Sequence, residues 1–132
     1  MVKVYLDTDC ILTLVKDKDW LKKPVEKRIK NEKKLCTSVL SVVESRLILI
    51  REENIDSALS VEEKIKNMNI KLLPLDEQIL KESNHLMWQF DFLGTFDALH
   101  IATAKLKKEK ILSTDHIFEL IPGLPVEDPR KE

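Results

Sequence analysis

The sequence predicts an α/β protein in which a parallel sheet lies between layers of helices. Short apolar segments that suit strands, at residues 2–6, 35–38, 70–73 and 111–113, alternate with longer segments of helical character. Such alternation is typical of right-handed crossovers between parallel strands. The chain has 132 residues, 43% of them hydrophobic, which suits one compact domain. We therefore expect a single three-layer domain over residues 1–132, with a central parallel sheet of four to five strands and the first strand at its centre.

The first half of the chain is expected to hold four helices between its strands. A polar turn from Lys16 to Asp19 ends the first helix, and the second helix is rich in charged residues. Ser41 and Glu44 have the spacing of a capping box, which predicts that the third helix begins there. The four helices are expected over residues 10–15, 20–31, 41–53 and 56–67.

The second half carries clear start and stop signals. Pro74 ends the third strand because proline cannot donate a ladder hydrogen bond. Asp76 and Thr95 are suited to cap the two helices that follow them. Pro122 and Gly123 form a turn before a short segment that suits an edge strand. The expected elements are helices over 76–90 and 96–107, a helical turn over 116–120 and an edge strand over 124–126.

Four acidic residues stand at junctions between strands and helices. Asp7 directly follows the first strand, Glu44 and Asp115 follow later strands, and Asp97 opens a helix. In a parallel α/β sheet, the carboxyl ends of the strands and the adjoining helix starts face one crevice. Four carboxylates there would repel one another and could not all stay ionised without a cation. Because hard divalent ions prefer oxygen ligands, the pattern predicts a Mg²⁺ or Mn²⁺ site for phosphoryl transfer.

Each acid also has a purely local interpretation, and the residues alone leave both interpretations open. Asp7 and Asp115 are suited to cap the helices that follow them. Glu44 can act only within the capping box, and Asp97 stands in a first turn, where the helix dipole favours an acid. Asp9 is either a cap or an outer ligand of the ion.

Four short motifs occur in a fixed order between residue 2 and about residue 126. They are Leu6-Asp7-Thr8-Asp9, Val42-Val43-Glu44, Asp97-Ala98-Leu99-His100-Ile101-Ala102 and Ser113-Thr114-Asp115-His116-Ile117-Phe118. Together they resemble the PIN domain, the ribonuclease fold of VapC-type toxins. The chain departs from the usual pattern with Asp9 in place of Asn or Ser, Ser113 in place of Thr and Phe96 in place of Pro. The resemblance implies a PIN-like fold for nearly the whole chain.

The resemblance also implies how the site is composed. Asp7 and Asp97 would coordinate Mg²⁺ or Mn²⁺ most directly, with Asp115 and Glu44 completing the site or ordering its waters. The ion would activate water and neutralise charge on the scissile phosphate. Supporting roles are implied for Thr8, Asp9, Ser113 and Thr114. His100 and His116 follow two of the acids and can approach the site, with His100 expected to support the site or to pack beside it.

Activity and partners follow from the same resemblance. The chain is expected to be a metal-dependent endoribonuclease, the toxin of a toxin–antitoxin pair, bound by a small antitoxin protein. Two basic clusters can attract the RNA backbone, and the one on the second helix is the better candidate. The expected RNA contacts are Lys22, Lys23, Lys27 and Arg28, in a basic stretch that continues through Lys30, Lys33 and Lys34. The second cluster is Lys105, Lys107, Lys108 and Lys110. For any single one of these residues, a solvated helix face is the alternative interpretation.

A homodimer is also expected, and the apolar residues of the third and fourth helices are a candidate surface for the dimer or for a partner helix. Most of these residues are nevertheless expected to pack in the core. They are Val39, Leu40, Leu47, Ile48, Ile50 and Leu59.

Two other functions fit parts of the same pattern. The segment Asp7-Thr8-Asp9 after a strand also suits a phosphatase of the haloacid dehalogenase class, with Asp7 as nucleophile. That class needs a lysine after a later strand and an acidic pair after another, whereas the last strand offers only Asp115. A degenerate PIN module that binds RNA or protein without catalysis is the second alternative, and the full set of acids argues against it.

Composition excludes several classes of protein. The net charge of −1 does not suit a wholly basic nucleic-acid binder or an acidic disordered tail. The sequence has no apolar run of about 18 residues and no signal-peptide pattern, so we expect a cytoplasmic protein without a membrane segment. Cys10 and Cys36 are the only cysteines, have no metal-ligand spacing and are expected to be buried thiols.

Overall fold

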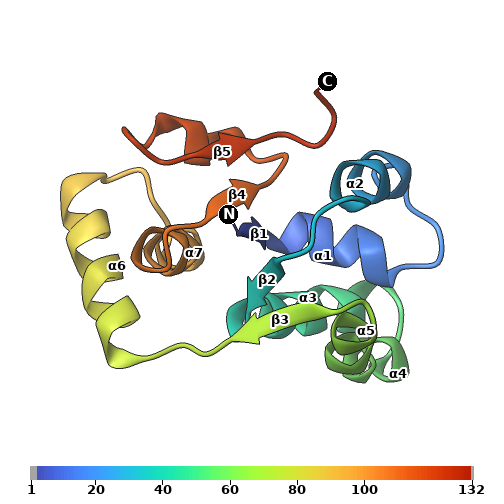
Figure 1. Ribbon diagram of the computed structural model, residues 1–132. Coiled ribbons are helices and arrows are strands. Elements are labelled where there is room, and N and C mark those ends of the chain that lie inside the picture. The colour runs from blue at the N-terminus through green and yellow to red at the C-terminus, as the bar shows by residue number, and fades with distance from the viewer. Residues whose placement is uncertain (1–2, 132) are drawn as a thin grey trace.

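A computed structural model describes residues 3–131 and confirms the α/β class. Five parallel strands form one sheet in the order β3-β2-β1-β4-β5 (Figure 1). The strands are β1 (Val4–Leu6), β2 (Leu35–Ser38), β3 (Ile70–Leu73), β4 (Lys110–Leu112) and β5 (Val126–Glu127). The first strand of the chain is central, as predicted, and every residue in it is buried.

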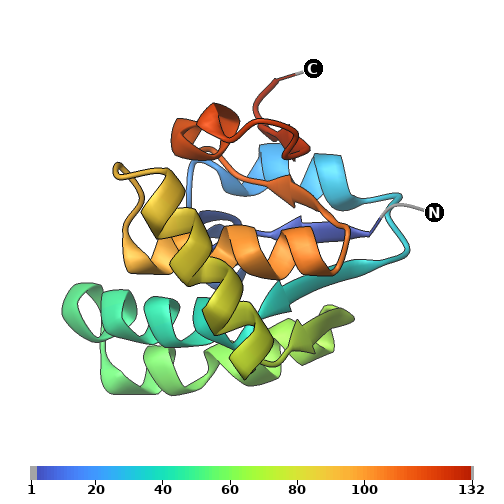
Figure 2. The same cartoon turned by 90° about the vertical axis from the view of Figure 1, so that its left-hand side faces the viewer.

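Helices cover both faces of the sheet and complete the three layers. Side chains alternate along β1, so Val4 and Leu6 join one apolar core and Tyr5 joins the other. The first core lies under α1 (Thr8–Val15), α2 (Lys22–Ile29), α3 (Val39–Glu52), α4 (Ile55–Leu59) and α5 (Val61–Asn67). The second core lies under α6 (Glu77–Gln89), α7 (Thr95–Leu106) and the 3-10 turn η1 (His116–Leu120), and Figure 2 shows α6 and α7 together in front of the sheet. No helix within the described residues is both long enough and apolar enough to cross a bilayer.

Helix α3 begins earlier than predicted, and a different serine caps it. Ser38, the last residue of β2, has an extended backbone, and its hydroxyl accepts from the backbone N–H of Leu40 at 3.0 Å. Ser41 lies inside the helix, where its buried hydroxyl is 2.8 Å from that of Thr37. The capping-box prediction for Ser41 and Glu44 is therefore wrong, because the strand runs directly into the helix. The Glu44 side chain is left to make contacts outside its own helix.

The single helix expected over 56–67 is divided into α4 and α5. The hydroxyl of Ser60, at the junction, donates to the carbonyl of Ser57 at 2.8 Å. A local bond from side chain to backbone of this kind competes with the regular helical pattern. Asn54 caps α4 by accepting from the N–H of Ser57 at 2.8 Å, so α4 begins at Ile55, one residue earlier than predicted.

The caps in the second half agree with prediction at one helix and differ at the next. Asp76 caps α6 as predicted, since its carboxylate accepts from the backbone N–H of Ile79 at 2.9 Å. Helix α7 begins at Thr95 itself, with Gly94 in the capping position and no side-chain cap, so the prediction that Thr95 is the cap is wrong. The edge strand β5 begins at Val126, two residues later than predicted.

The register of the sheet brings the ends of β1 and β4 together. Leu6 pairs with Leu112, so Asp7 and Ser113, the residues that follow them, emerge side by side. The backbone N–H of Asp7 donates to the carbonyl of Leu112 at 3.0 Å and fixes this alignment. Because β1 is flanked by β2 and β4, the starts of α1, α3 and η1 all lie at this carboxyl edge.

Candidate active site at the carboxyl ends of the strands

Asp7 stands at the junction of β1 and α1, with its carboxylate turned toward other segments. It occupies the capping position of α1 but makes no side-chain cap bond, so its local interpretation as a cap is wrong. Its Oδ2 accepts from the Ser113 hydroxyl at 2.7 Å, and its Oδ1 lies 3.7 Å from Nε2 of His100. The residue is only 7% exposed. Asp7 is therefore a buried acid that connects the first strand to the end of β4 and to α7.

His100 lies at the centre of this polar cluster. It stands one turn after Asp97 on α7 and is 2% exposed. The hydroxyl of Tyr5 lies 2.6 Å from its Nδ1, while its Nε2 contacts Glu44 and lies 3.2 Å from the hydroxyl of Thr8. Tyr5 also packs edge-on against the imidazole, with 5.7 Å between the ring centres. His100 therefore joins β1, α1 and α3, which agrees with the supporting position expected for it.

Glu44 reaches the same cluster from α3. Its Oε1 accepts from the Thr8 hydroxyl at 2.8 Å and contacts Nε2 of His100. Burial pushes the pKa of Glu44 up, but the hydrogen bond to His100 and the charge of His100 outweigh burial, so the pKa lies below its ordinary value. Burial likewise disfavours charged His100, yet Glu44 and the other nearby acids raise the pKa of His100 above its ordinary value. Each residue therefore stabilises the charged form of the other.

Asp97 and Asp115 lie close enough for the charge of one to act on the other. Asp97 stands in the first turn of α7, and Asp115 caps η1 by accepting from the N–H of Ile117 at 3.0 Å. The N–H of Asp115 donates at 3.0 Å to the Ser113 hydroxyl, which in turn donates to Asp7. Burial first, and then the charge of Asp115, raise the pKa of Asp97. Asp115 is thus a cap and also a neighbour of the other acids.

Burial has a larger effect on the pKa of Asp7 than repulsion from the other acids does. Removal from water raises the pKa of Asp7 to about 6, although the charge of His100 and the hydrogen bond from Ser113 act in the opposite direction. Mutual repulsion among the acids would raise the pKa of every member, and Asp7 and Asp97 do show raised values. Glu44 shows the opposite direction because His100 is its immediate partner.

Asp9 anchors the loop after β4 to the start of α1. Its Oδ2 accepts from the backbone N–H of Thr114 at 2.8 Å and also from the Thr114 hydroxyl. Its Oδ1 accepts from the N–H of Cys10 at 2.7 Å. Both carboxylate oxygens are thus engaged by protein groups. Because the anchored loop carries Ser113 and Asp115, Asp9 helps to fix where those two side chains lie.

The donor set suits a hard divalent cation, although the side chains are not gathered into a finished metal site. Within residues 3–131, no group of three or more His, Cys, Asp or Glu side chains is arranged to hold a metal ion. Glu44 is engaged by His100, and Asp7 by Ser113. Four carboxylates nevertheless supply the oxygen ligands that Mg²⁺ and Mn²⁺ prefer. Burial raises the pKa of Asp7 and of Asp97 because it disfavours their charged forms, and a bound cation would stabilise those charged forms.

Two residues of the predicted RNA-binding helix have partners within the fold. The guanidinium of Arg28 pairs with Glu127 of β5 and, at 2.7 Å, with Glu32. The ammonium of Lys22 donates to the carbonyl of Lys16 at 2.7 Å. These contacts tie α2 to the edge of the sheet and to the end of α1.

A basic groove runs between α2 and the last residues of the chain. It has a volume of about 700 Å³ and its basic lining residues are Lys23, Lys27, Arg28, Arg130 and Lys131. Arg130 pairs with Asp128 at 2.6 Å, and its Nη2 donates to the carbonyl of Thr114 at 3.4 Å. The groove therefore adjoins the loop that carries Ser113 and Asp115.

Sequence reasoning missed part of this arrangement and misplaced one residue. The ring of His116 faces Glu119, with Nδ1 at 3.3 Å from Oε2, and both side chains are well exposed, so His116 turns away from the cluster. Tyr5, which holds His100, was not singled out. The signal was available in the alternation of β1, since Tyr5 and Asp7 stand two residues apart and point to the same face.

The chain belongs to the PIN domain family, whose model matches residues 4–124. This match covers all four motifs and confirms the resemblance drawn from them. It gives no support to the alternative haloacid dehalogenase class. No curated protein matches the chain in sequence.

Solved structures of toxin–antitoxin proteins share this fold. The DNA-bound VapBC of Salmonella typhimurium has a TM-score of 0.79 at 21% identity, over 98% of this chain and 99% of that one. VapBC-1 of nontypeable Haemophilus influenzae has a TM-score of 0.78 at 18% identity, over 99% and 100%. VapC20 of Mycobacterium tuberculosis, a sarcin–ricin loop cleaving toxin, has a TM-score of 0.75 at 16% identity, over 89% and 93%. At these identities the likeness establishes the fold, and function is argued from the site.

Proposed function

We propose that this protein is a metal-dependent endoribonuclease and the toxin of a toxin–antitoxin pair. The observation that carries the proposal is the meeting of acids from four separate segments of the chain around His100 and Ser113. Membership of the PIN domain family supports a nuclease, and the VapC-like fold supports the role of a toxin.

The roles follow from the contacts in the cluster. Mg²⁺ or Mn²⁺ would be held by the four carboxylates Asp7, Glu44, Asp97 and Asp115. When bound, the cation supplies a Lewis acid that activates water and neutralises charge on the phosphate. His100 is a positioning residue in this proposal, because it holds Glu44 and faces Asp7. The hydroxyl of Ser113 orients Asp7, and that of Thr8 orients Glu44.

The RNA backbone is proposed to follow the basic groove toward the acids. Lys23, Lys27, Arg130 and Lys131 would meet its phosphates there, and release of counterions would favour binding. The bond from Arg130 to the Thr114 carbonyl places the groove beside the candidate active site. Lys22 and Arg28 would also hold α2 in place through their contacts with the Lys16 carbonyl and with Glu127.

A second copy of the chain is proposed to cover α3 and α4. The prediction that their apolar residues mostly pack in the core is wrong for several of them, although Leu40 is buried. The face is formed by Val39, Val43, Leu47, Ile50, Ile55 and Leu59, each at least 38% exposed. Contiguous exposed apolar surface of this kind marks an interaction site. Leu47→Lys should shift sedimentation of the protein from dimer to monomer, whereas Leu80→Lys on α6, also half exposed, should not.

An antitoxin is the other proposed partner. The structures from Salmonella typhimurium and Haemophilus influenzae are toxin–antitoxin complexes, and this chain covers nearly all of each matched chain. A small protein encoded beside this one should therefore bind it and suppress its activity. Co-expression followed by purification of the complex would test that partnership.

RNA cleavage tests the proposed activity directly. The wild-type protein should cleave RNA in Mg²⁺ or Mn²⁺ and lose that activity in excess chelator. Asp7→Asn and Asp97→Asn should each reduce cleavage at least about a hundredfold, because each removes a carboxylate that would hold the cation. Asp91→Asn, at an exposed acid of the α6–α7 loop, is the matched control and should cleave normally. Cleavage that persists in chelator, or in Asp97→Asn, would contradict the proposed metal site. A wild-type protein that binds RNA but does not cleave it in Mg²⁺ or Mn²⁺ would favour a module that only binds.

A further inference from the structure

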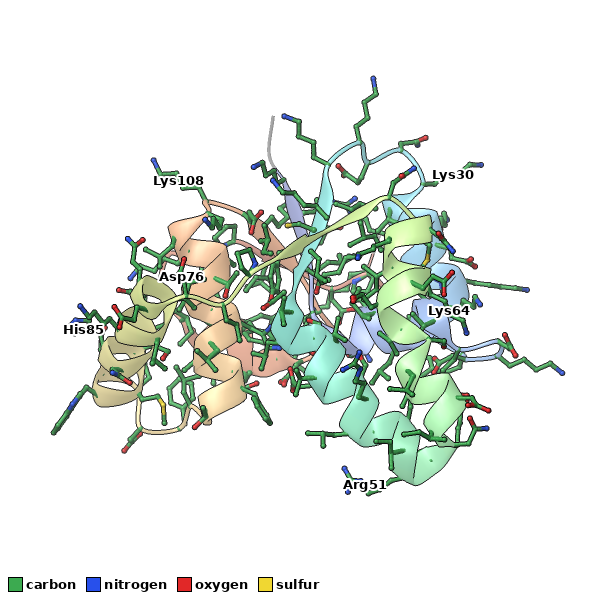
Figure 3. All side chains as sticks on the ribbon, turned by 90° about the horizontal axis from the view of Figure 1, so that it is seen from below. Lys30, Arg51, Lys64, Asp76, His85 and Lys108 are labelled. Atoms are coloured by element: carbon green, nitrogen blue, oxygen red, sulfur yellow. The ribbon has the colours of Figure 1, made fainter. Side chains whose placement is uncertain are left out.

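A second polar cavity lies at the amino ends of the strands, at the opposite edge of the sheet from the candidate active site. It has a volume of about 320 Å³. Its polar lining includes Lys3, Lys33, Lys34, Lys71, Cys36 and Glu109. In Figure 3, Lys30 and Lys108 mark this end of the domain, whereas Arg51 of α3 lies at the other end. We call this hollow the amino-end cavity.

Glu109 is the unusual group in the amino-end cavity. The residue is 2% exposed, and its Oε2 lies 2.8 Å from Sγ of Cys36, a free and buried thiol as predicted. Its Oε1 is buried and has no hydrogen-bond partner within residues 3–131. An unpaired buried acceptor carries a desolvation cost of about 1–3 kcal/mol, and more when it is charged. This carboxylate oxygen can therefore accept a hydrogen bond from a donor that the described part of the chain does not supply.

The backbone directs Glu109 inward. Lys108 adopts the left-handed conformation, with φ of 54°, and the N–H of Glu109 donates to the carbonyl of Ala104 at 2.9 Å. This bond turns the chain sharply from α7 into β4. The Glu109 side chain then reaches beneath β1 to Cys36 on β2, since β1 lies between β2 and β4.

Positive charge surrounds the mouth of the amino-end cavity. Lys3, Lys33, Lys34 and Lys71 all line it and are exposed, and no ion pair of theirs is found in the described part of the chain. One buried carboxylate cannot balance four ammonium groups. Because the whole chain has a net charge of only −1, this excess is local rather than a property of the surface as a whole. The rim therefore suits an anionic group.

We propose that the amino-end cavity binds a guanine mononucleotide, with the base on Glu109 and the phosphate among the lysines. The Watson–Crick edge of guanine presents two adjacent N–H donors. One would bond to the unpaired Oε1 of Glu109, and the other to Oε2, which accepts a single bond from Cys36 and keeps a second lone pair. Leu35 and Leu73 line the same cavity and supply apolar contact for the flat base. The volume lies at the lower end of the range of small-molecule sites, which suits one nucleotide rather than a chain of them. The proposal is independent of the activity proposed for the carboxyl edge.

Binding of GMP, IMP and inorganic phosphate to the full chain, measured by titration calorimetry, tests the base contact. IMP lacks the exocyclic amino group of guanine and should bind about tenfold or more weakly than GMP, because it cannot form one of the two bonds to the charged acceptor. Glu109→Gln should remove this preference while binding of phosphate stays unchanged. Equal affinity for GMP and IMP, or a preference that survives in Glu109→Gln, would overturn the proposal.

The lysines supply a second test that does not depend on the buried residue. Lys34→Ala combined with Lys71→Ala should weaken GMP binding about tenfold or more, because both residues are exposed and the fold does not rest on them. The matched control is Lys18→Ala combined with Lys81→Ala, which removes the same charge from exposed positions outside the cavity and should bind GMP as the wild type does. The inference fails if wild-type protein binds no GMP at millimolar concentration, or if the two double variants behave alike.

Discussion

The carboxyl edge of the sheet, where the strands end, and the amino edge, where they begin, each contain a buried carboxylate. The charges around these two carboxylates are opposite. At the carboxyl edge, Asp7 is engaged by Ser113 and faces His100, and further acids leave negative charge in excess. At the amino edge, Glu109 keeps one oxygen without a partner among the described residues, and four lysines form the rim. A net charge of −1 conceals this polarity, because it sums all 22 basic and 23 acidic residues of the chain.

Burial and the charge of neighbouring residues affect the two carboxylates in separate ways. Burial is the largest cause of the raised pKa at both Asp7 and Glu109. What differs is the charge of the groups nearby, and that charge decides which ligand each edge would attract. An acidic cluster with buried members calls for a cation, and a basic rim around a buried acceptor calls for an anion that carries a donor.

The largest expected difference between the edges is in metal binding. Mn²⁺ at about 100 times its dissociation constant should raise the free energy of unfolding by about 2.7 kcal/mol. Asp97→Asn should lose most of this stabilisation, whereas Glu109→Gln should keep it, since Glu109 lies at the other edge. Urea unfolding with and without Mn²⁺ measures both. Stabilisation of Asp97→Asn equal to that of the wild type would place the ion elsewhere.

Loss of His100 should have the next largest effect. His100→Gln removes the group that holds Glu44 beside Asp7, and RNA cleavage should fall about 10- to 100-fold, as expected for a group that orients ligands. The affinity for Mn²⁺ should weaken as well, which a defect confined to stability would not cause. His85→Gln on α6 is the control, because His85 is exposed. A normal Mn²⁺ affinity in His100→Gln would show that the histidine only packs.

The path of the RNA can be assigned to one edge by its salt dependence. Lys23→Ala with Lys27→Ala should lower the slope of log affinity against log salt by about 1 for each phosphate that the protein no longer neutralises. Lys34→Ala with Lys71→Ala removes equal charge at the amino edge and should leave the slope unchanged. The measurement is binding of a short RNA in Ca²⁺, which limits cleavage. A reduced slope only in the second pair would move the RNA to the amino edge.

The smallest effect concerns stability and pH. Because burial raises the pKa of Glu109, the folded state holds its proton more tightly than the unfolded state does. The stability that Glu109 contributes should be complete below the unfolded pKa and be lost as the pH rises through the folded value. Glu127 should behave in the opposite way, since Arg28 lowers its pKa and its contribution is lost as the pH falls. The measurement is the free energy of unfolding of Glu109→Gln and of Glu127→Gln, each relative to the wild type, as a function of pH. A difference that changes in the same direction with pH for both variants would contradict the prediction.

The sequence by itself determined the order of strands and helices and the residues that end the strands. Periodicity and turn residues are local signals, so the parallel class, the central first strand and the cap at Asp76 could be predicted. The acids could be found because they directly follow apolar strands or open a helix, and parallel strands end at one edge. Four motifs in order were enough to indicate the PIN domain family, which the match over residues 4–124 confirms.

Only the tertiary structure decided which side chains meet. Ser38 caps α3 instead of Ser41 because β2 continues to the helix start, and the exposed apolar face of α3 and α4 depends on what packs against them. The contact between Tyr5 and His100 joins residues 95 positions apart, and that between Cys36 and Glu109 joins residues 73 positions apart. Such pairs are set by the pairing register of the strands and by how helices pack on the sheet. Local patterns carry no information about either, because they report which face a residue occupies and not what lies opposite it.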